Sequence, residues 1–125
     1  MTEQNEMEAA HAIRRQVLGD AYVDAQAGGG DPEFQDFITR TAWGTWARGG
    51  ALSTRDRSLL TLAMTAALGR MEEFGLHARS AGRAGVSDEE VDELLFQIAA
   101  YCGAPAGVSA RRAVVAARTE RDQAE

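Results

Sequence analysis

The chain has 125 residues, of which 45% are hydrophobic and 26% are charged, and its formal net charge is −6 at pH 7. This length suits one domain with a buried core, so we expect residues 1–125 to form a single domain. The negative charge argues against nucleic acid and against an anionic membrane surface, because both attract basic patches. We therefore predict neither as a partner.

The residue types narrow the chemistry further. All thirteen cationic side chains are arginine, and without lysine the chain can neither form a Schiff base with a substrate nor anchor pyridoxal phosphate. The single cysteine, Cys102, cannot form an internal disulfide, which fits a reducing compartment. No segment approaches the roughly 20 apolar residues that span a bilayer. The polar residues 1–8 are unlike a signal peptide, so we expect a cytoplasmic protein.

The hydrophobic periodicity predicts an all-α fold of about six helices, without the alternating pattern of a strand. The first helix is expected at about Glu6–Leu18, ending at Gly19, with a loop through the glycine run at 28–30. The second opens at Asp31, an N-cap that precedes Pro32 at the first helical position. It should end in the break at 48–51, and its expected buried face is Phe34, Phe37, Ile38 and Thr41.

The third helix, about Thr54–Leu68, is apolar on almost every side. Ser53 and Asp56 have the spacing of a capping box at its start. A helix without a polar face is buried all round, so we expect it to be central in the domain or completed by another subunit.

Three more helices follow. The fourth is expected at about Met71–Ala81, and the fifth begins with a capping box of Ser87 and Glu90. The fifth carries an apolar stripe expected in the core: Val91, Leu94, Leu95, Ile98 and Cys102. The sixth is expected at about Val108–Thr119, after a break at 103–107. Residues 1–5 and 120–125 are expected to fray.

Glu73 and His77 stand four residues apart on the fourth helix and therefore share one face. A carboxylate beside an imidazole is the minimal equipment for proton transfer near neutral pH. The alternative is an exposed histidine with a chance acidic neighbour, and the spacing alone leaves both interpretations open.

Several stretches carry a resemblance, and they recur in order between Val17 and Arg118. They are Val17–Asp20, Ala42–Gly44, Arg57–Met64, Ala67–Arg70, Glu72-Glu73 with His77, Gly85-Val86 and Tyr101–Ala106. Together they resemble the carboxymuconolactone decarboxylase family, which has an alkylhydroperoxidase-like helical fold. The resemblance implies a homo-oligomer, often a trimer or hexamer. It also implies cofactor-free decarboxylation of 4-carboxymuconolactone to 3-oxoadipate enol-lactone in aromatic catabolism.

The resemblance also suggests roles for individual residues. We expect His77 to be the general acid or the donor to an oxyanion, with Glu73 holding its tautomer. Arg57 is a candidate clamp for a substrate carboxylate, because arginine binds carboxylates with two hydrogen bonds. Its alternative role is an ion pair with Asp56 or another nearby acid.

Other residues are candidates for the walls of the pocket. Trp43, Trp46 and Tyr101 are aromatic candidates, although aromatic residues at helix ends also serve as core. Pro105 lies where free backbone N–H groups at the start of the sixth helix could bind an anion. Val108 follows Gly107 where the family usually has Ala-Asn, which replaces an amide by a side chain without hydrogen-bonding groups.

The lactone is itself an electron sink, so we expect no cofactor. Two histidines far apart in sequence, without a cysteine cluster, give no metal-ligand spacing, so we expect no metal. Two alternatives remain at this stage. One is an enzyme of the same kind that acts on another lactone or enolisable acid, and the other is a non-catalytic oligomeric binding protein.

Overall fold

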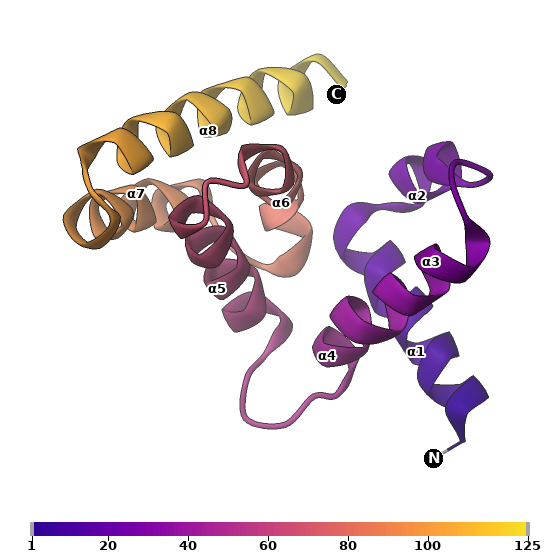
Figure 1. Ribbon diagram of the computed structural model, residues 1–125. Helices are drawn as coiled ribbons and strands as arrows, with labels where there is room; N and C mark the ends of the chain where they lie inside the picture. Colours follow the sequence, from indigo (N-terminus) through magenta and orange to yellow (C-terminus); the bar gives the residue numbers. More distant parts are fainter. Residues whose placement is uncertain (1, 125) are drawn as a thin grey trace. The chain divides into compact units, whose positions relative to one another are not determined.

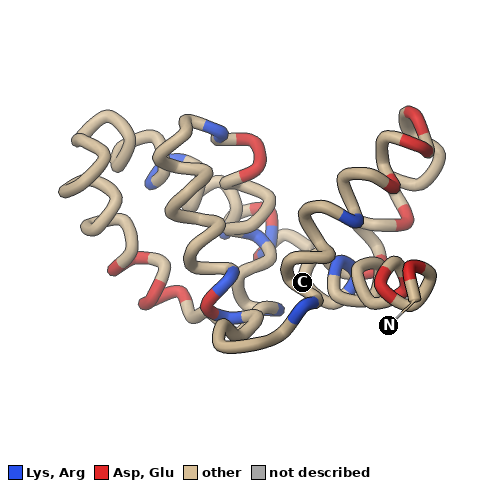
Figure 2. The backbone as a smooth tube through the Cα atoms, turned by 60° about the horizontal axis from the view of Figure 1, so that its bottom comes forward, with Lys and Arg blue, Asp and Glu red and all other residues tan. Residues whose placement is uncertain are grey.

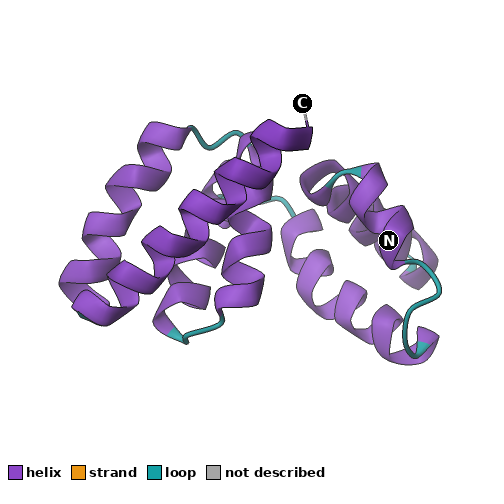
Figure 3. Cartoon of the chain, turned by 90° about the horizontal axis from the view of Figure 1, so that it is seen from above, coloured by secondary structure: helices purple, strands orange, loops and turns teal. Residues whose placement is uncertain are grey.

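The computed structural model describes residues 2–124, and the fold in this range is entirely helical, as the sequence predicted (Figure 1). Figure 3 shows helices joined by short loops, and no strand occurs between residues 2 and 124. The chain forms two compact units, unit 1 at Met1–Thr54 and unit 2 at Arg55–Glu125. Met1 and Glu125 lie outside the described residues, and the single-domain expectation stays a prediction.

Unit 1 is a cluster of short helices packed on one longer helix. Its elements are α1 (Glu3–Leu18), α2 (Asp20–Gln26), α3 (Pro32–Ile38), the π-helix η1 (Thr39–Trp43) and α4 (Gly44–Ala47). The first helix packs against α2, η1 and α4. Its buried side chains are few, namely Ala10, Val17, Leu18, Val23, Thr39 and Trp43.

The helix α2 replaces a stretch that was expected to be a loop. Gly19 ends α1, as predicted, with a φ of 89° that favours glycine. The chain then turns directly into α2, whose Asp20 and Asp24 both accept hydrogen bonds from Arg15 of α1, at 3.1 and 2.8 Å. Hydrophobic periodicity does not report contacts between neighbouring helices, so it did not predict this short helix.

The second predicted helix is present but divided. Asp31 caps α3 by accepting a hydrogen bond from the Glu33 N–H, with Pro32 in the first turn, as expected. The expected buried face is wrong, because Phe34 is 62% exposed and Phe37, Ile38 and Thr41 are also exposed. Phe34, Phe37 and Ile38 belong to α3, which has no buried residue, and the buried residues of this segment are Thr39 and Trp43 of η1.

Unit 2 consists of longer helices around one core. They are α5 (Thr54–Ala67), α6 (Met71–Ala84), α7 (Asp88–Cys102) and α8 (Ala104–Ala124), and α8 packs on both α6 and α7. The capping box of Ser87 and Glu90 is confirmed by both of its hydrogen bonds. The buried core is Leu62, Ala66, Phe74, Ala81, Val86, Val91, Ile98, Ala110 and Val114.

The last helix starts earlier and ends later than predicted. It begins at Ala104 because proline, here Pro105, is compatible with the first turn of a helix, where its missing N–H has no intrahelical acceptor. Its far end is held to the start of α7 by two arginines. Arg121 donates to both Asp88 oxygens at 2.9 and 3.2 Å, and Arg118 pairs with Asp92 at 2.9 Å. Figure 2 colours the acidic and basic residues along the backbone. Of the residues expected to fray, 3–5 and 120–124 are helical.

Two expectations about burial in unit 2 are wrong. Leu60 and Met64 of α5 are exposed, as is Leu68 directly after it, so this helix is not buried on every side within the chain. Cys102, expected in the core, is also exposed, because it lies at the last turn of α7. Among the described residues, no helix is long and apolar enough to cross a membrane.

Candidate functional site

The histidine singled out by the sequence, His77, lies on the inner face of α6. That face repeats every three or four residues and consists of Phe74, His77, Ser80, Ala81 and Ala84. His77 is 8% exposed, whereas Glu73, one turn earlier, is exposed. The helix therefore carries an imidazole in the core and a carboxylate at the surface beside it.

Burial changes the protonation of His77. Loss of hydration lowers its pKa from 6.5 to about 4, and the negative charge of Glu73 opposes this shift only partly. The imidazole is therefore neutral at pH 7. A neutral imidazole donates a hydrogen bond from one ring nitrogen and accepts at the other. His77 can therefore act as an uncharged hydrogen-bond donor, or it can take up a proton when a negatively charged group binds beside it.

Arg57 lies in the first turn of α5, where its side chain is partly buried. Asp56, its alternative partner in the sequence analysis, lies 3.6 Å from Arg55. Arg57 therefore lies on α5, whereas Glu73 and His77 lie on α6 of the same unit.

Ser58, directly after Arg57, is a polar group that sequence reasoning missed. Its side chain is 1% exposed, and its hydroxyl has no hydrogen-bond partner among the described residues. A buried hydroxyl without a partner costs about 1–3 kcal/mol, which marks it as a candidate contact for a ligand. The available signal was a serine inside the apolar run of a predicted helix.

The two tryptophans belong to unit 1. Trp43 ends η1 and is buried, while Trp46 in α4 is partly buried. Their rings pack together, with centroids 5.0 Å apart and planes inclined by 36°. The structure therefore joins these two predicted wall residues to each other.

The remaining wall candidates lie where α7 meets α8. Tyr101 is 81% exposed, Pro105 is exposed in the first turn of α8, and Val108 is about half exposed. Val108 borders an open groove between α7 and α8, and this groove does not include His77, Glu73 or Arg57. Within unit 2, the candidate acid-base pair and Val108 thus occupy different places.

Gly107, before Val108, has a packing role. A Cβ at this position would lie 2.6 Å from the Cβ of Ala99 on α7, closer than carbon atoms approach. The glycine therefore allows the backbones of α7 and α8 to come together.

The described residues offer no group of three or more His, Cys, Asp or Glu side chains placed to hold a metal ion.

Comparison with known proteins identifies the class. The sequence model of the Carboxymuconolactone decarboxylase family matches residues 32–116, and the chain belongs to this family. The matched range contains the α6 pair, Arg57 and both tryptophans.

Two curated relatives are decarboxylases by name. The 4-carboxymuconolactone decarboxylase of Acinetobacter baylyi is 38% identical over 102 residues, covering 78% of this chain and 75% of the relative. The nitrosuccinic acid decarboxylase of Metarhizium robertsii is 37% identical over 117 residues, covering 90% and 80%. The family, fold class and enzyme predictions are confirmed: the chain is a carboxy-lyase of this family. The binding-protein alternative receives no support from these relatives.

Proposed function

We propose that this enzyme decarboxylates 4-carboxymuconolactone to 3-oxoadipate enol-lactone, without a cofactor. The observation that carries the proposal is the buried, neutral His77 with Glu73 one turn away, inside the region that matches the family. The similarity to the bacterial 4-carboxymuconolactone decarboxylase supports the choice of substrate.

The reaction needs few protein groups. The carboxylate to be lost is on the ring carbon that is conjugated through a C=C bond to the lactone carbonyl. When its C–C bond breaks, CO2 leaves and the electron pair moves through the C=C bond to the carbonyl oxygen, giving a dienolate. A proton then adds to the carbon next to the carbonyl. The site must stabilise the oxyanion, seat the carboxylate away from water and deliver the proton.

A neutral His77 suits this sequence. Because the imidazole is uncharged before the substrate binds, it can take up a proton when the substrate arrives. The substrate carries two carboxylates, and nearby negative charge raises the pKa of an imidazole. We therefore expect His77 to take up a proton as the substrate binds and to deliver it to the dienolate carbon. Glu73 stabilises the imidazolium.

The other residues keep their proposed roles. Arg57 holds the carboxylate that is not lost, and Ser58 is an additional hydrogen-bond donor from the same turn of α5. Trp43 and Trp46 of unit 1, and Tyr101, Pro105 and Val108 of unit 2, stay separate candidates for contact with the substrate.

A second candidate substrate is favoured by the fungal relative. In nitrosuccinic acid a carboxylate is on the carbon that bears the nitro group, and loss of CO2 leaves a nitronate. Both reactions leave a carbanion conjugated to an electron sink, so the same His77 serves either one. This candidate is a specific form of the alternative in which the enzyme acts on another enolisable acid.

The test is turnover of both substrates by purified protein. We expect CO2 release from 4-carboxymuconolactone, with loss of the lactone's ultraviolet absorbance, and slower or no release from nitrosuccinate. His77→Ala should lower kcat/KM by about 10²–10⁴-fold. His11→Ala, which alters an exposed histidine of α1, is the matched control and should leave it unchanged.

Each outcome bears on a separate part of the proposal. Preference for nitrosuccinate by the folded protein would replace the substrate, and normal activity of His77→Ala would remove the assigned role. The pH profile of kcat/KM gives a further check, because it reports the free enzyme. Since the proton is taken up on binding, kcat/KM should fall as the pH rises above about 4, the pKa of His77, rather than above 6.5.

We also propose that the enzyme is a homo-oligomer, a trimer or hexamer, in the bacterial cytoplasm, and that it serves the β-ketoadipate pathway of aromatic catabolism. The exposed apolar side chains of α5 support assembly, and the product, an enol-lactone of 3-oxoadipate, supports the pathway. Sedimentation velocity measures the assembly directly.

A further inference from the structure

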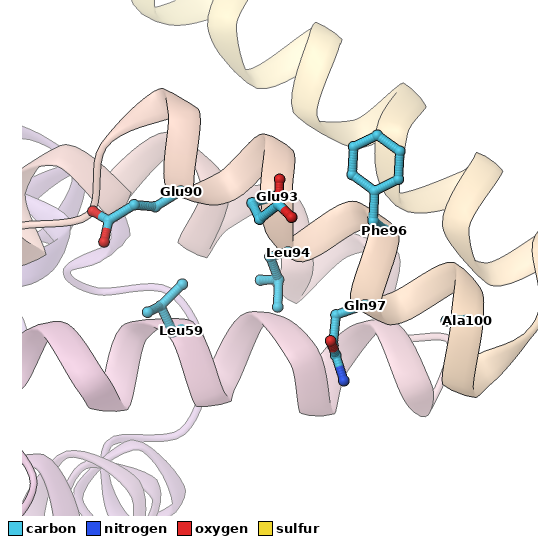
Figure 4. Close-up of a pocket in the computed structure, with 7 residues that line it drawn as sticks. All are labelled: Leu59, Glu90, Glu93, Leu94, Phe96, Gln97 and Ala100. Carbon is cyan, nitrogen blue, oxygen red and sulfur yellow. The ribbon is translucent and has the colours of Figure 1, made fainter.

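Two grooves run along the flanks of α7 in unit 2. The first, between α5 and α7, has a volume of about 490 Å³ and is bordered by Leu59, Leu94, Glu90, Glu93 and Phe96. Figure 4 shows Leu59 and Leu94 between the two helices, with Phe96 pointing away from α5. We name it the acidic groove.

The second groove, between α7 and α8, has a volume of about 590 Å³. Its apolar border includes Phe96, Val108 and Val115, and its charged border includes Arg111 and Arg112. We name it the basic groove. Because Phe96 borders both grooves, its ring forms the crest between them.

Some of the charged side chains that line the two grooves have an ion-pair partner, and others do not. In the acidic groove, Glu90 pairs with Arg55 and accepts the Ser87 N–H, whereas Glu93 has no ion pair within residues 2–124. In the basic groove, Arg118 is paired with Asp92. Arg111 and Arg112 have no ion pair with any described residue. Among the described residues, one carboxylate on one flank and two guanidinium groups on the other therefore have no ion-pair partner.

The crest between the grooves is apolar and open to solvent. Phe96 is 73% exposed, and Val108 and Val115 are each about half exposed. A contiguous apolar surface with a polar rim is typical of a protein interface. A partner that binds this surface must place positive charge over Glu93 and negative charge over Arg111 and Arg112. A second copy of the chain presents both kinds of charge on the same surface.

We propose that this surface binds a second copy of the chain, with the acidic groove of one copy facing the basic groove of the other. A two-fold axis running along α7 produces this arrangement and brings the two Phe96 rings together at the centre. A two-fold axis across α7 would face like grooves to each other, placing Glu93 against Glu93. Charge complementarity therefore selects α7 helices that run parallel across the interface.

The test uses charge reversal with rescue. Glu93→Arg makes both grooves basic, and Arg111→Glu with Arg112→Glu makes both acidic, so each variant alone repels its own copies. Each should weaken self-association at least about tenfold in sedimentation velocity. An equimolar mixture of the two variants should restore assembly, because every acidic groove again faces a basic one. Misfolded variants could not produce this recovery.

The matched control is Arg83→Glu, which reverses an exposed arginine of α6 in the same unit and should not change the sedimentation of the protein. The proposal is overturned if the wild-type chain sediments as a monomer of 13.4 kDa at tens of micromolar, or as a trimer, which contains no two-fold axis. It is also overturned if the reversed variants assemble like wild type, or if they dissociate and the mixture does not recover. It rests on the proposed homo-oligomer, and because sedimentation needs no substrate, its failure is distinguishable from failure of the decarboxylase assignment.

Discussion

Units 1 and 2 differ in how they bury apolar side chains. Unit 2 buries large side chains from all four of its helices around Phe74, and the candidate acid-base pair lies on one of these helices. Unit 1 depends on one longer helix, and its α3 has no buried residue. The contrast shows that amphipathic helices form wherever local signals favour them, whereas a core requires several helices to contribute large side chains to one place.

The largest expected effect separates the two cores. Phe74→Ala removes a side chain that is fully buried in unit 2 and should lower the free energy of unfolding by about 3–5 kcal/mol. Phe34→Ala removes an identical ring that is mostly exposed in unit 1 and should cost less than about 0.5 kcal/mol. Urea denaturation measures both. Equal losses would show that Phe34 is buried in the protein in solution, and the contrast between the units would then fail.

The next effect concerns the buried imidazole of unit 2. Between pH 6.5 and about 4, His77 is protonated in the unfolded chain but not in the folded chain. The free energy of unfolding should therefore decrease as the pH is lowered through this window. The full loss approaches about 3 kcal/mol. His77→Gln should flatten this dependence, and His11→Gln, at an exposed site of unit 1, should leave it in place. Urea midpoints measured across the window provide the comparison.

A smaller effect tests the close approach of α7 and α8. Gly107→Ala places a methyl group against Ala99 and should destabilise the protein by about 1–3 kcal/mol. Gly82→Ala, on an exposed part of α6 with no atom near the new methyl group, should stabilise it by up to about 1 kcal/mol. Thermal unfolding of both variants measures the change in stability. Opposite signs would show that the effect depends on whether the new methyl group meets Ala99, and not on the loss of a glycine alone.

The smallest effect concerns the surface clamp between α7 and α8. The hydrogen bond from Arg121, together with the charge of Arg118, lowers the pKa of Asp88 below its ordinary 3.8. The stabilisation is present above pH 3.8 and is lost as the pH falls through the lower folded pKa. Asp88→Asn should slightly lower Tm near pH 7, and less at high ionic strength, because these side chains are exposed and screened. A salt-independent change in Tm would contradict an electrostatic clamp.

Much of the fold could be predicted because its signals are local. Asp31 with Pro32, and Ser87 with Glu90, mark helix starts that the structure confirms. What failed depended on partners distant in sequence. The helix α2 is held by Arg15 of α1, and the end of α8 is held by the acids of α7. Burial failed for a similar reason, since an apolar stripe shows that a surface avoids water but does not identify what covers it.

The site could be predicted only in part. The four-residue spacing of Glu73 and His77 placed them on one helix, but the spacing could not show that one is buried and the other exposed. The lowered pKa of His77 follows from that burial and was therefore invisible in the sequence. Ser58 was overlooked for the same reason, because its burial depends on how α5 packs.

The π-helix at Thr39–Trp43 makes the length of this segment a structural variable. A π turn holds about one residue more than an α turn, and one residue in an α-helix corresponds to a rotation of about 100°. Deleting a single residue here would let the segment close into a regular α-helix while turning α4, which carries Trp46, to a different side. Insertion and deletion, rather than substitution, are therefore the changes that would redirect the two tryptophans during evolution or engineering.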